Sequence, residues 1–353
     1  MIRLPNFEVS SPETISDLVS LLADGNSKTA ILAGGSDLIV NLKNGLEEPE
    51  QVIWLGKIGE LSRLSFEFGA GLRIGAMCTL HDIAESPLVK QNFPALADTV
   101  QTIASPAIRN RATIGGNLCL DTRCYYYNQS EFWRGALGGC LKGNLSNGGS
   151  NTHCHAAPGL SLCSAVFCSD LAPLLIAVGA SVKLVDPKGE RIMLLKDFYR
   201  EDGVSHLALN HNEILVEVLI PQLRSDLKIG QKKIRSRAAV DFPLANAAVV
   251  MEIGDGNICK HVKIVLGAVG SAPVEAQKAA SLITGKILTG DLLEAAGDAA
   301  AGSVKPLPNT GVTAGYRKKM VKALVERLLK ELVKEHKTPR LRRSPLTRGT
   351  PMG

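Results

Sequence analysis

Six of the eight cysteines of this 353-residue chain lie in one tract that runs from Cys119 to Cys168. The tract is rich in Gly, Ser and Asn and has few aliphatic side chains, so an apolar core of its own cannot hold it in place. Cysteine thiolates bind zinc and iron-sulfur clusters, and in a reducing compartment clustered cysteines do this more often than they form disulfides. The residue types and their clustering therefore predict a metal or redox site.

The spacing of the cysteines leaves three interpretations open. Four thiolates in the pattern C-x15-C-x13-C-x8-C would suit an iron-sulfur cluster; they belong to Cys124, Cys140, Cys154 and Cys163. Zinc accepts the same thiolates, or a mixture with His153 and His155. The cysteines would also serve as small buried residues of a packed loop. Because six cysteines exceed four ligands, spacing alone does not choose among them.

Two glycine pairs predict a second kind of site. Gly34 and Gly35 follow an apolar run in ILAGGSDL, and Gly115 and Gly116 lie in ATIGGN. Glycine lets backbone amides approach a ligand closely, and successive amides form a concavity that binds anions such as pyrophosphate. A structural turn explains one such pair well, but two pairs flanked by hydroxyl or acidic side chains favour binding. Neither a GxGxxG fingerprint nor a P-loop occurs in the sequence.

Hydrophobic periodicity and turn residues predict the elements that position these motifs. Helices are expected at residues 15–25, 79–85, 273–283 and 316–333, and strands at 30–33, 52–55, 72–74 and 213–221. A new element is expected to begin at residues 37–42. From about residue 227 the sequence alternates as antiparallel strands do. The pattern predicts an α+β protein with an N-terminal domain over 1–224, in subdomains of about 1–58 and 59–224, and a smaller α+β domain over 225–335.

The net charge of +6 at pH 7 comes largely from the end of the chain. Residues 336–353 carry five Lys or Arg, no Asp or Glu and three prolines, which is typical of a disordered basic tail. No aromatic-plus-basic motif accompanies the tail, so we expect no nucleic-acid binding. No apolar run is long enough to cross a bilayer and the first residues lack a secretory signal, so we expect a cytoplasmic protein without membrane contact.

The glycine motifs resemble those of a known family. ILAGGSDLIVNLK and ATIGGNL are similar to the FAD-binding subunit of the molybdenum hydroxylases, which include xanthine and carbon monoxide dehydrogenases. Other similar segments are LRIGAMCTLHDI, SDLAPLL, FPLANAAV, VLGAVGSAP and GYRKKMVKALV, so the likeness extends from about Leu4 to Leu332. It implies a two-subdomain FAD-binding domain of the PCMH type and a C-terminal domain of the CO dehydrogenase flavoprotein type.

The resemblance also implies which residues contact FAD. Those of the two glycine motifs are Ile31, Leu32, Ala33, Gly34, Gly35, Ser36, Asp37, Thr113, Ile114, Gly115, Gly116 and Asn117. Asp170 matches an acid near the ribityl chain, and Lys233 matches a lysine that approaches the flavin. Taken by itself, Asp170 would equally be a helix N-cap, and Lys233 a solvated lysine beside Lys232.

The cysteine tract resembles an insertion. In most members of the family a short linker joins TIGGN to the segment that contains Asp170, whereas here roughly forty additional residues intervene, and long irregular loops are usually functional. An insertion of this kind, at about residues 119–168, is similar to that of 4-hydroxybenzoyl-CoA reductases, whose FAD subunit carries a [4Fe-4S] cluster. The resemblance implies Cys124, Cys140, Cys154 and Cys163 as ligands, and Cys119 and Cys168 as packing residues.

The function implied is electron transfer, with no catalytic residue in this chain. Partners would be a molybdopterin-containing large subunit and a small subunit with [2Fe-2S] clusters, in a dimer of heterotrimers. In a 4-hydroxybenzoyl-CoA reductase, which acts in anaerobic aromatic degradation, electrons from ferredoxin would reach the molybdenum subunit through the [4Fe-4S] cluster and FAD. The alternative is the FAD subunit of another molybdenum hydroxylase that passes electrons to NAD or a quinone. A zinc-stabilised binding module without flavin is a third class, which the glycine pairs disfavour.

Overall fold

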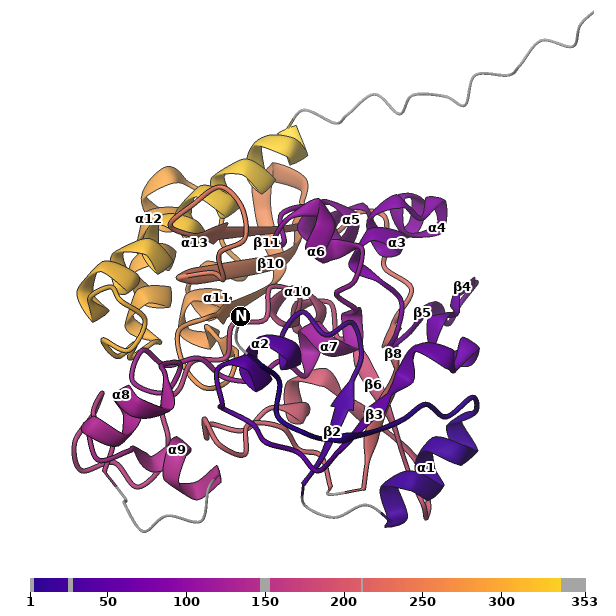
Figure 1. Ribbon diagram of the computed structural model, residues 1–353. Coiled ribbons are helices and arrows are strands. Elements are labelled where there is room, and N and C mark those ends of the chain that lie inside the picture. The colour runs from indigo at the N-terminus through magenta and orange to yellow at the C-terminus, as the bar shows by residue number, and fades with distance from the viewer. Residues whose placement is uncertain (1–2, 25–27, 147–152, 211, 338–353) are drawn as a thin grey trace, which may run out of the picture.

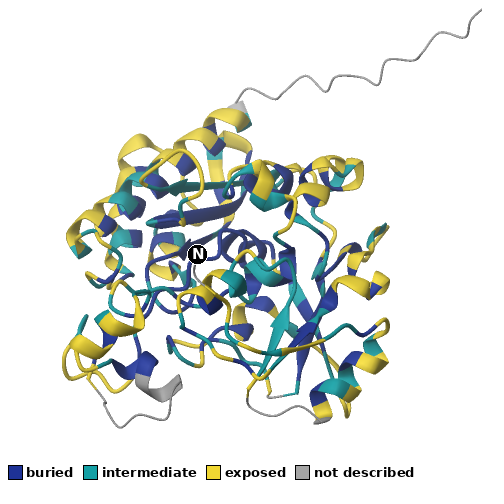
Figure 2. Cartoon of the chain, viewed as in Figure 1, coloured by how far each residue is buried: buried dark blue, intermediate teal, exposed yellow. Residues whose placement is uncertain are grey.

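The computed structural model describes residues 3–24, 28–146, 153–210 and 212–337 (Figure 1). These residues form three β-sheets of three, five and four strands, each with its own helices. Buried residues lie between sheets and helices, while the outer helix faces are exposed (Figure 2). No helix among the described residues is both long and apolar enough to cross a membrane.

The first sheet is parallel and built from residues near the N-terminus. Its strand order is β1-β3-β2, and its elements are β1 (Glu8–Ser10), α1 (Ile15–Asp24), β2 (Thr29–Leu32), α2 (Leu38–Lys43) and β3 (Gln51–Trp54). The apolar face of α1 buries Leu18 and Leu22 against Ile53. This amphipathic pattern is the one that predicted the helix from sequence. The first glycine pair lies between β2 and α2.

The second sheet is antiparallel and joins segments far apart in the chain. Its strand order is β4-β5-β8-β6-β7, with β4 (Leu64–Glu67), β5 (Gly71–Gly75), β6 (Ser181–Asp186), β7 (Gly189–Leu194) and β8 (Ile214–Ile220). Between β5 and β6 come α3 (Leu80–Glu85), α4 (Pro87–Asn92), α5 (Pro94–Gln101), α6 (Pro106–Arg109), α7 (Ile114–Leu118) and α10 (Ala172–Ala177). Prolines begin α4, α5 and α6, because the first helical residue needs no N–H partner.

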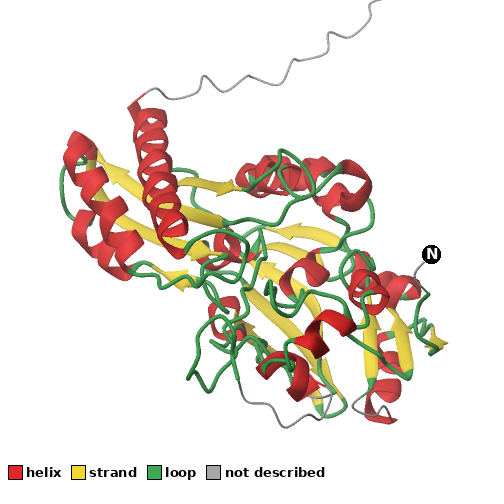
Figure 3. Ribbon diagram, turned by 60° about the vertical axis from the view of Figure 1, so that its left-hand side comes forward, coloured by secondary structure: helices red, strands yellow, loops and turns green. Residues whose placement is uncertain are grey.

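The third sheet is also antiparallel, in the order β12-β11-β10-β9. Its elements are β9 (Lys228–Ile234), β10 (Ala245–Gly254), β11 (Ile258–Gly267), β12 (Val274–Glu275), α11 (Gln277–Ile283), α12 (Gly290–Gly302) and α13 (Ala314–Lys337). Helix α13 packs on β9 and β10 (Figure 3).

Two boundaries in this region differ from the sequence-based expectation. The helix expected from Pro273 begins at Gln277, because Val274 and Glu275 pair with β11. The basic tail was expected from residue 336, but α13 continues to Lys337, and 338–353 lie outside the described residues.

The cysteine tract lies between the second glycine pair and α10, apart from the three sheets. It contains two short helices, α8 (Glu131–Ala136) and α9 (Leu141–Ser146), and otherwise irregular chain (Figure 1). An antiparallel bridge between Arg123 and Val166 closes its base. The tract therefore leaves and rejoins the domain at neighbouring points, as an insertion does.

Candidate functional site

The first glycine pair provides unused backbone donors. Gly35 has a φ of +77°, a conformation that glycine adopts readily. Within the described part of the chain, the N–H groups of Gly35 and Ser36 donate no hydrogen bond. Adjacent free amides at a glycine turn are suited to binding an anion. This segment thus has the local geometry that was expected of a pyrophosphate contact.

The second glycine pair differs from the expected turn, because it begins helix α7. The Thr113 hydroxyl caps the helix by accepting from Gly116 N–H at 3.1 Å. Gly115 N–H donates to the carbonyl of Ala76 at 2.9 Å, and Ile114 N–H donates to the carbonyl of Cys78 at 3.0 Å. These amides are already used within the protein. If the residues of this segment contact FAD as predicted, they must do so through atoms other than these amide groups.

The two glycine segments are in direct contact. A Cβ atom placed on Gly34 would overlap the carbonyl oxygen of Arg111, two residues before Thr113. A Cβ atom on Gly115 would lie only 2.8 Å from the carbonyl oxygen of Ala76. Glycine is therefore required at both positions by close backbone approach. The structure thus joins motifs that are about eighty residues apart in the chain.

Asn117 and the Ser169–Asp170 segment extend this region toward the third sheet. Asn117 Oδ1 accepts from the Ser169 hydroxyl at 2.8 Å and from Leu171 N–H at 3.2 Å. Lys233 Nζ lies 2.8 Å from Asp170 Oδ1, and both side chains are almost completely buried. Burial raises the pKa of Asp170 and lowers the pKa of Lys233, while each charge opposes the shift of the other.

The structure excludes the alternative roles of the two residues, which were a helix N-cap for Asp170 and a solvated surface lysine for Lys233. Leu171 is the N-cap of α10 and the Ser169 hydroxyl accepts from Ala172 N–H, so Asp170 does not cap the helix. Lys233 is buried, whereas Lys232 is partly exposed and pairs with Glu331. A charged pair buried beside the glycine segments suits a polar ligand better than a surface role.

Replacing Thr113 with Ala tests the capped start of α7. Loss of the Gly116 hydrogen bond is expected to reduce the free energy of unfolding by about 1 kcal/mol and to weaken FAD retention. Thermal unfolding and the FAD-to-protein ratio measure the two effects. Thr289→Ala is the matched control, because Thr289 caps α12 by accepting from Leu292 N–H. It should give a similar stability loss without loss of FAD; equal FAD loss in both variants would contradict a role for α7.

The four cysteines singled out from the sequence line one cavity. They are Cys124, Cys140, Cys154 and Cys163. All except Cys124 are buried, and Cys124 is half-buried. The tract has two small apolar clusters, one of Cys154 and Cys163 with Leu141 and Ala165, the other of Cys140 with Leu46 and Tyr127, and Cys124 packs against both. Cys168, by contrast, belongs to the main core of the second sheet, and Cys119 packs against that core.

Burial and hydrogen bonding act in opposite directions on the cysteine thiols of the cavity. Burial raises the pKa of Cys124, and it raises the pKa of Cys163 to about 12. Backbone N–H groups point at two sulfurs, Gly143 to Cys140 Sγ and Ala165 to Cys163 Sγ, each at 3.4 Å. Such bonds favour thiolate, whereas burial disfavours it. For Cys163, burial outweighs both the Ala165 N–H and the charge of Lys142, so its pKa stays raised.

No three His, Cys, Asp or Glu side chains in the described ranges are placed so that they could hold a metal ion. This finding supports neither a zinc ion nor an iron-sulfur cluster at the four cysteines. His155 lines the cavity, but its Nε2 lies 2.6 Å from the carbonyl oxygen of Gly139.

Contacts that the sequence analysis missed fasten the tract to the first glycine segment. Asp37 forms an ion pair with Arg123 and accepts from Asp121 N–H at 3.1 Å. Asp37 does not cap α2 with its side chain. Tyr127 donates from its buried hydroxyl to the carbonyl of Leu46 at 3.2 Å. The residue before Cys124 therefore touches a residue of the first glycine motif. No local sequence pattern predicts the ion pair of Asp37 with Arg123, because the two residues are far apart in the chain.

Comparisons with known proteins agree with this architecture. Residues 5–223 match the family model described as the FAD binding domain in molybdopterin dehydrogenase, and 232–332 match the CO dehydrogenase flavoprotein C-terminal domain. The carbon monoxide dehydrogenase medium chain of Hydrogenophaga pseudoflava is 29% identical over 92% of this chain and 96% of its own. The nicotinate dehydrogenase FAD-subunit of Eubacterium barkeri is 24% identical over 94% of this chain and 97% of its own.

A solved structure shows the same fold. Carbon monoxide dehydrogenase from H. pseudoflava, in a form lacking the Mo-pyranopterin moiety, superimposes with a TM-score of 0.75 at 28% identity, over 93% of this chain and 97% of that one. The fold and the paired glycine segments define a flavoprotein of the oxidoreductase class. The chain belongs to the FAD-binding medium subunits of the molybdenum hydroxylase family. The expected mixed FAD-binding domain with a C-terminal domain is confirmed.

Proposed function

We propose that this chain is the electron-transferring FAD subunit of a molybdenum-containing enzyme and that it works with a molybdopterin-containing large subunit and a [2Fe-2S] small subunit. Bound FAD would supply a centre that exchanges electrons one or two at a time. The first glycine segment would hold the pyrophosphate through the N–H groups of Gly35 and Ser36. The buried pair of Asp170 and Lys233 would lie toward the polar part of the flavin. The support is the contact between the glycine segments together with the family membership.

Among finer functions, the relatives named above favour a dehydrogenase, which would pass electrons to NAD or a quinone. They are enzymes of carbon monoxide and nicotinate. One observation favours instead a subunit with its own iron-sulfur centre, as in 4-hydroxybenzoyl-CoA reductases. It is the convergence of Cys124, Cys140, Cys154 and Cys163 on one cavity, although they are spread over forty residues of irregular chain.

Four cysteines are a donor set that a [4Fe-4S] cluster accepts. Each of the four irons of such a cluster binds its own cysteine, so the ligands stand further apart than four ligands on one zinc ion. The four cysteines share one cavity, although no three His, Cys, Asp or Glu side chains of the described chain are placed to hold a metal ion. When bound, the cluster would supply a one-electron redox centre and hold together a segment with almost no apolar core.

Metal and flavin analysis tests the proposal. The full chain, purified without oxygen, should contain FAD and about four iron atoms with equal acid-labile sulfide. FAD without iron would remove the cluster and leave the dehydrogenase alternative. A chain without absorbance near about 450 nm would contradict the flavin itself.

The two finer functions are separated by their electron partners. A complex co-expressed with its partner subunits should accept electrons from reduced ferredoxin and remove the hydroxyl from 4-hydroxybenzoyl-CoA if it is the reductase. Reduction of NAD or a quinone by the complex with an oxidisable substrate, and no reaction with the thioester, would favour the alternative.

A further inference from the structure

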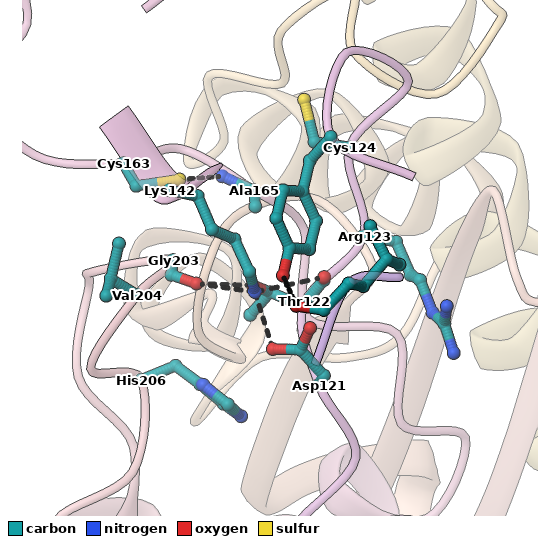
Figure 4. Close-up of polar contacts among 12 residues, drawn as sticks. Asp121, Thr122, Arg123, Cys124, Lys142, Cys163, Ala165, Gly203, Val204 and His206 are labelled. Carbon is teal, nitrogen blue, oxygen red and sulfur yellow. Dashed lines mark hydrogen bonds and ion pairs between the residues drawn. The ribbon is translucent and has the colours of Figure 1, made fainter. Parts of the chain in front are cut away.

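A buried lysine lies between the four-cysteine cavity and an aspartate. Lys142, two residues after Cys140, lines the cavity and is only 5% exposed. Its Nζ lies 2.5 Å from Asp121 Oδ1, 2.6 Å from Thr122 Oγ1 and 3.1 Å from the carbonyl oxygen of Gly203 (Figure 4). The ammonium also lies 4.9 Å from the centre of the Tyr127 ring. These contacts hold one positive charge in a fixed place within a low-dielectric environment.

The positive charge is nearer to the cavity than its counter-charge. Lys142 lines the cavity, whereas no Asp, Glu or Arg of the described chain does so. In Figure 4 the ammonium lies between Asp121 on one side and Cys124 and Cys163 on the other. Asp121 is 22% exposed and is therefore better screened by water than Lys142. The ion pair of Lys142 and Asp121 is therefore a dipole whose positive end faces the cysteine sulfurs.

Lys142 is also hydrogen-bonded to Gly203, which in turn contacts Cys163. Gly203 N–H donates to the carbonyl of Cys163 at 2.7 Å, and a Cβ atom on Gly203 would come within 2.8 Å of Cys163 Sγ. Thr122 donates to the Gly203 carbonyl at 2.5 Å and accepts from Lys142. Hydrogen bonds thus connect Lys142 through Thr122 and Gly203 to the backbone of Cys163. They keep the ammonium from turning away when the charge of the site changes.

We propose that Lys142 is an electrostatic positioning residue of the four-cysteine site, where its ammonium favours the reduced form of the centre and so raises its reduction potential. The inference rests on the proposed iron-sulfur centre. Reduction adds one electron and no proton, so the site becomes more negative by one charge. A nearby buried cation stabilises that added charge, and net charge and hydrogen bonding are known determinants of cluster potentials. A lysine that only braced the fold would not have this effect.

The test measures the midpoint potential of the centre in the full chain by a redox titration followed by electron paramagnetic resonance. Lys142→Gln keeps a hydrogen-bond donor but removes the charge. It is expected to make reduction at least tenfold less favourable, a shift of about 59 mV to lower potential for a one-electron couple. Lys142→Arg retains the charge and should stay close to the wild-type midpoint. Lys90→Gln is the control, because Lys90 pairs with Glu85 on the exposed surface.

Asp121→Asn is a second test that leaves Lys142 in place. Removing the negative end of the pair should raise the potential, in the direction opposite to Lys142→Gln. Wild-type midpoints in both variants, with full iron content, would overturn the inference, and so would shifts in the same direction. If Lys142→Gln fails to keep iron, the sign of the Asp121→Asn shift decides. A wild-type chain that contains no iron would contradict the proposed centre itself, which distinguishes that failure from this one.

Discussion

Replacing Cys140 with Ser is expected to remove most of the iron from the chain while FAD stays bound. Cys140 is buried at the cavity, and its sulfur accepts from Gly143 N–H. A hydroxyl binds iron much less well than a thiolate does at neutral pH. Iron and acid-labile sulfide per chain, beside the FAD-to-protein ratio, measure the result. FAD should remain because both glycine segments lie outside the cysteine cavity.

Cys119→Ser is the matched control for this experiment. It is the same substitution in the same tract, but Cys119 packs against the core of the second sheet and does not line the cavity. Iron content should be unchanged in this variant. Equal iron loss in both variants would mean that the ligand set is wrong. Equal loss of iron and FAD from Cys140→Ser would mean that the tract supports the fold of the whole domain.

Replacing Gly34 with Ala is expected to give the second large effect. The added methyl group would overlap the Arg111 carbonyl, and the atoms that it meets are all backbone atoms of Arg111 and Ala112, so no flexible side chain can move away. The first and second glycine segments must then separate. We expect the free energy of unfolding to fall by about 3 kcal/mol. FAD should be lost or bound much more weakly, because the amides of Gly35 and Ser36 would no longer be held beside α7.

Gly59→Ala provides the comparison for Gly34→Ala. A Cβ atom on Gly59 meets no atom within 4 Å, so the methyl group points into open space. Chemical denaturation and FAD content of this variant should match the wild type. A Gly34→Ala chain that retained full FAD content and stability would show that the close approach of the two segments is dispensable for the cofactor.

Several features of the protein were determined by local sequence. Helix α1 and strands β2 and β3 lie within a residue or two of the expected ranges, because apolar periodicity and glycine record local structure directly. The glycine pair at Gly34 was identifiable because only glycine, which has no Cβ, lets another backbone segment approach so closely. The clustering of cysteines was equally visible. Which four share a cavity was implied only by family resemblance.

Other features were decided by tertiary structure alone. The second glycine pair resembles a turn in sequence, yet Thr113 caps a helix there by accepting from Gly116 N–H, and Gly115 N–H donates to the carbonyl of Ala76. The ion pair of Asp37 with Arg123 and the contacts of Lys142 with Asp121 and Gly203 join segments from different parts of the chain. Sequence periodicity reports only which face of an element is buried. Whether a buried charged side chain is paired depends on how distant segments pack. The arrangement of charges around the cysteines is therefore decided by the tertiary structure.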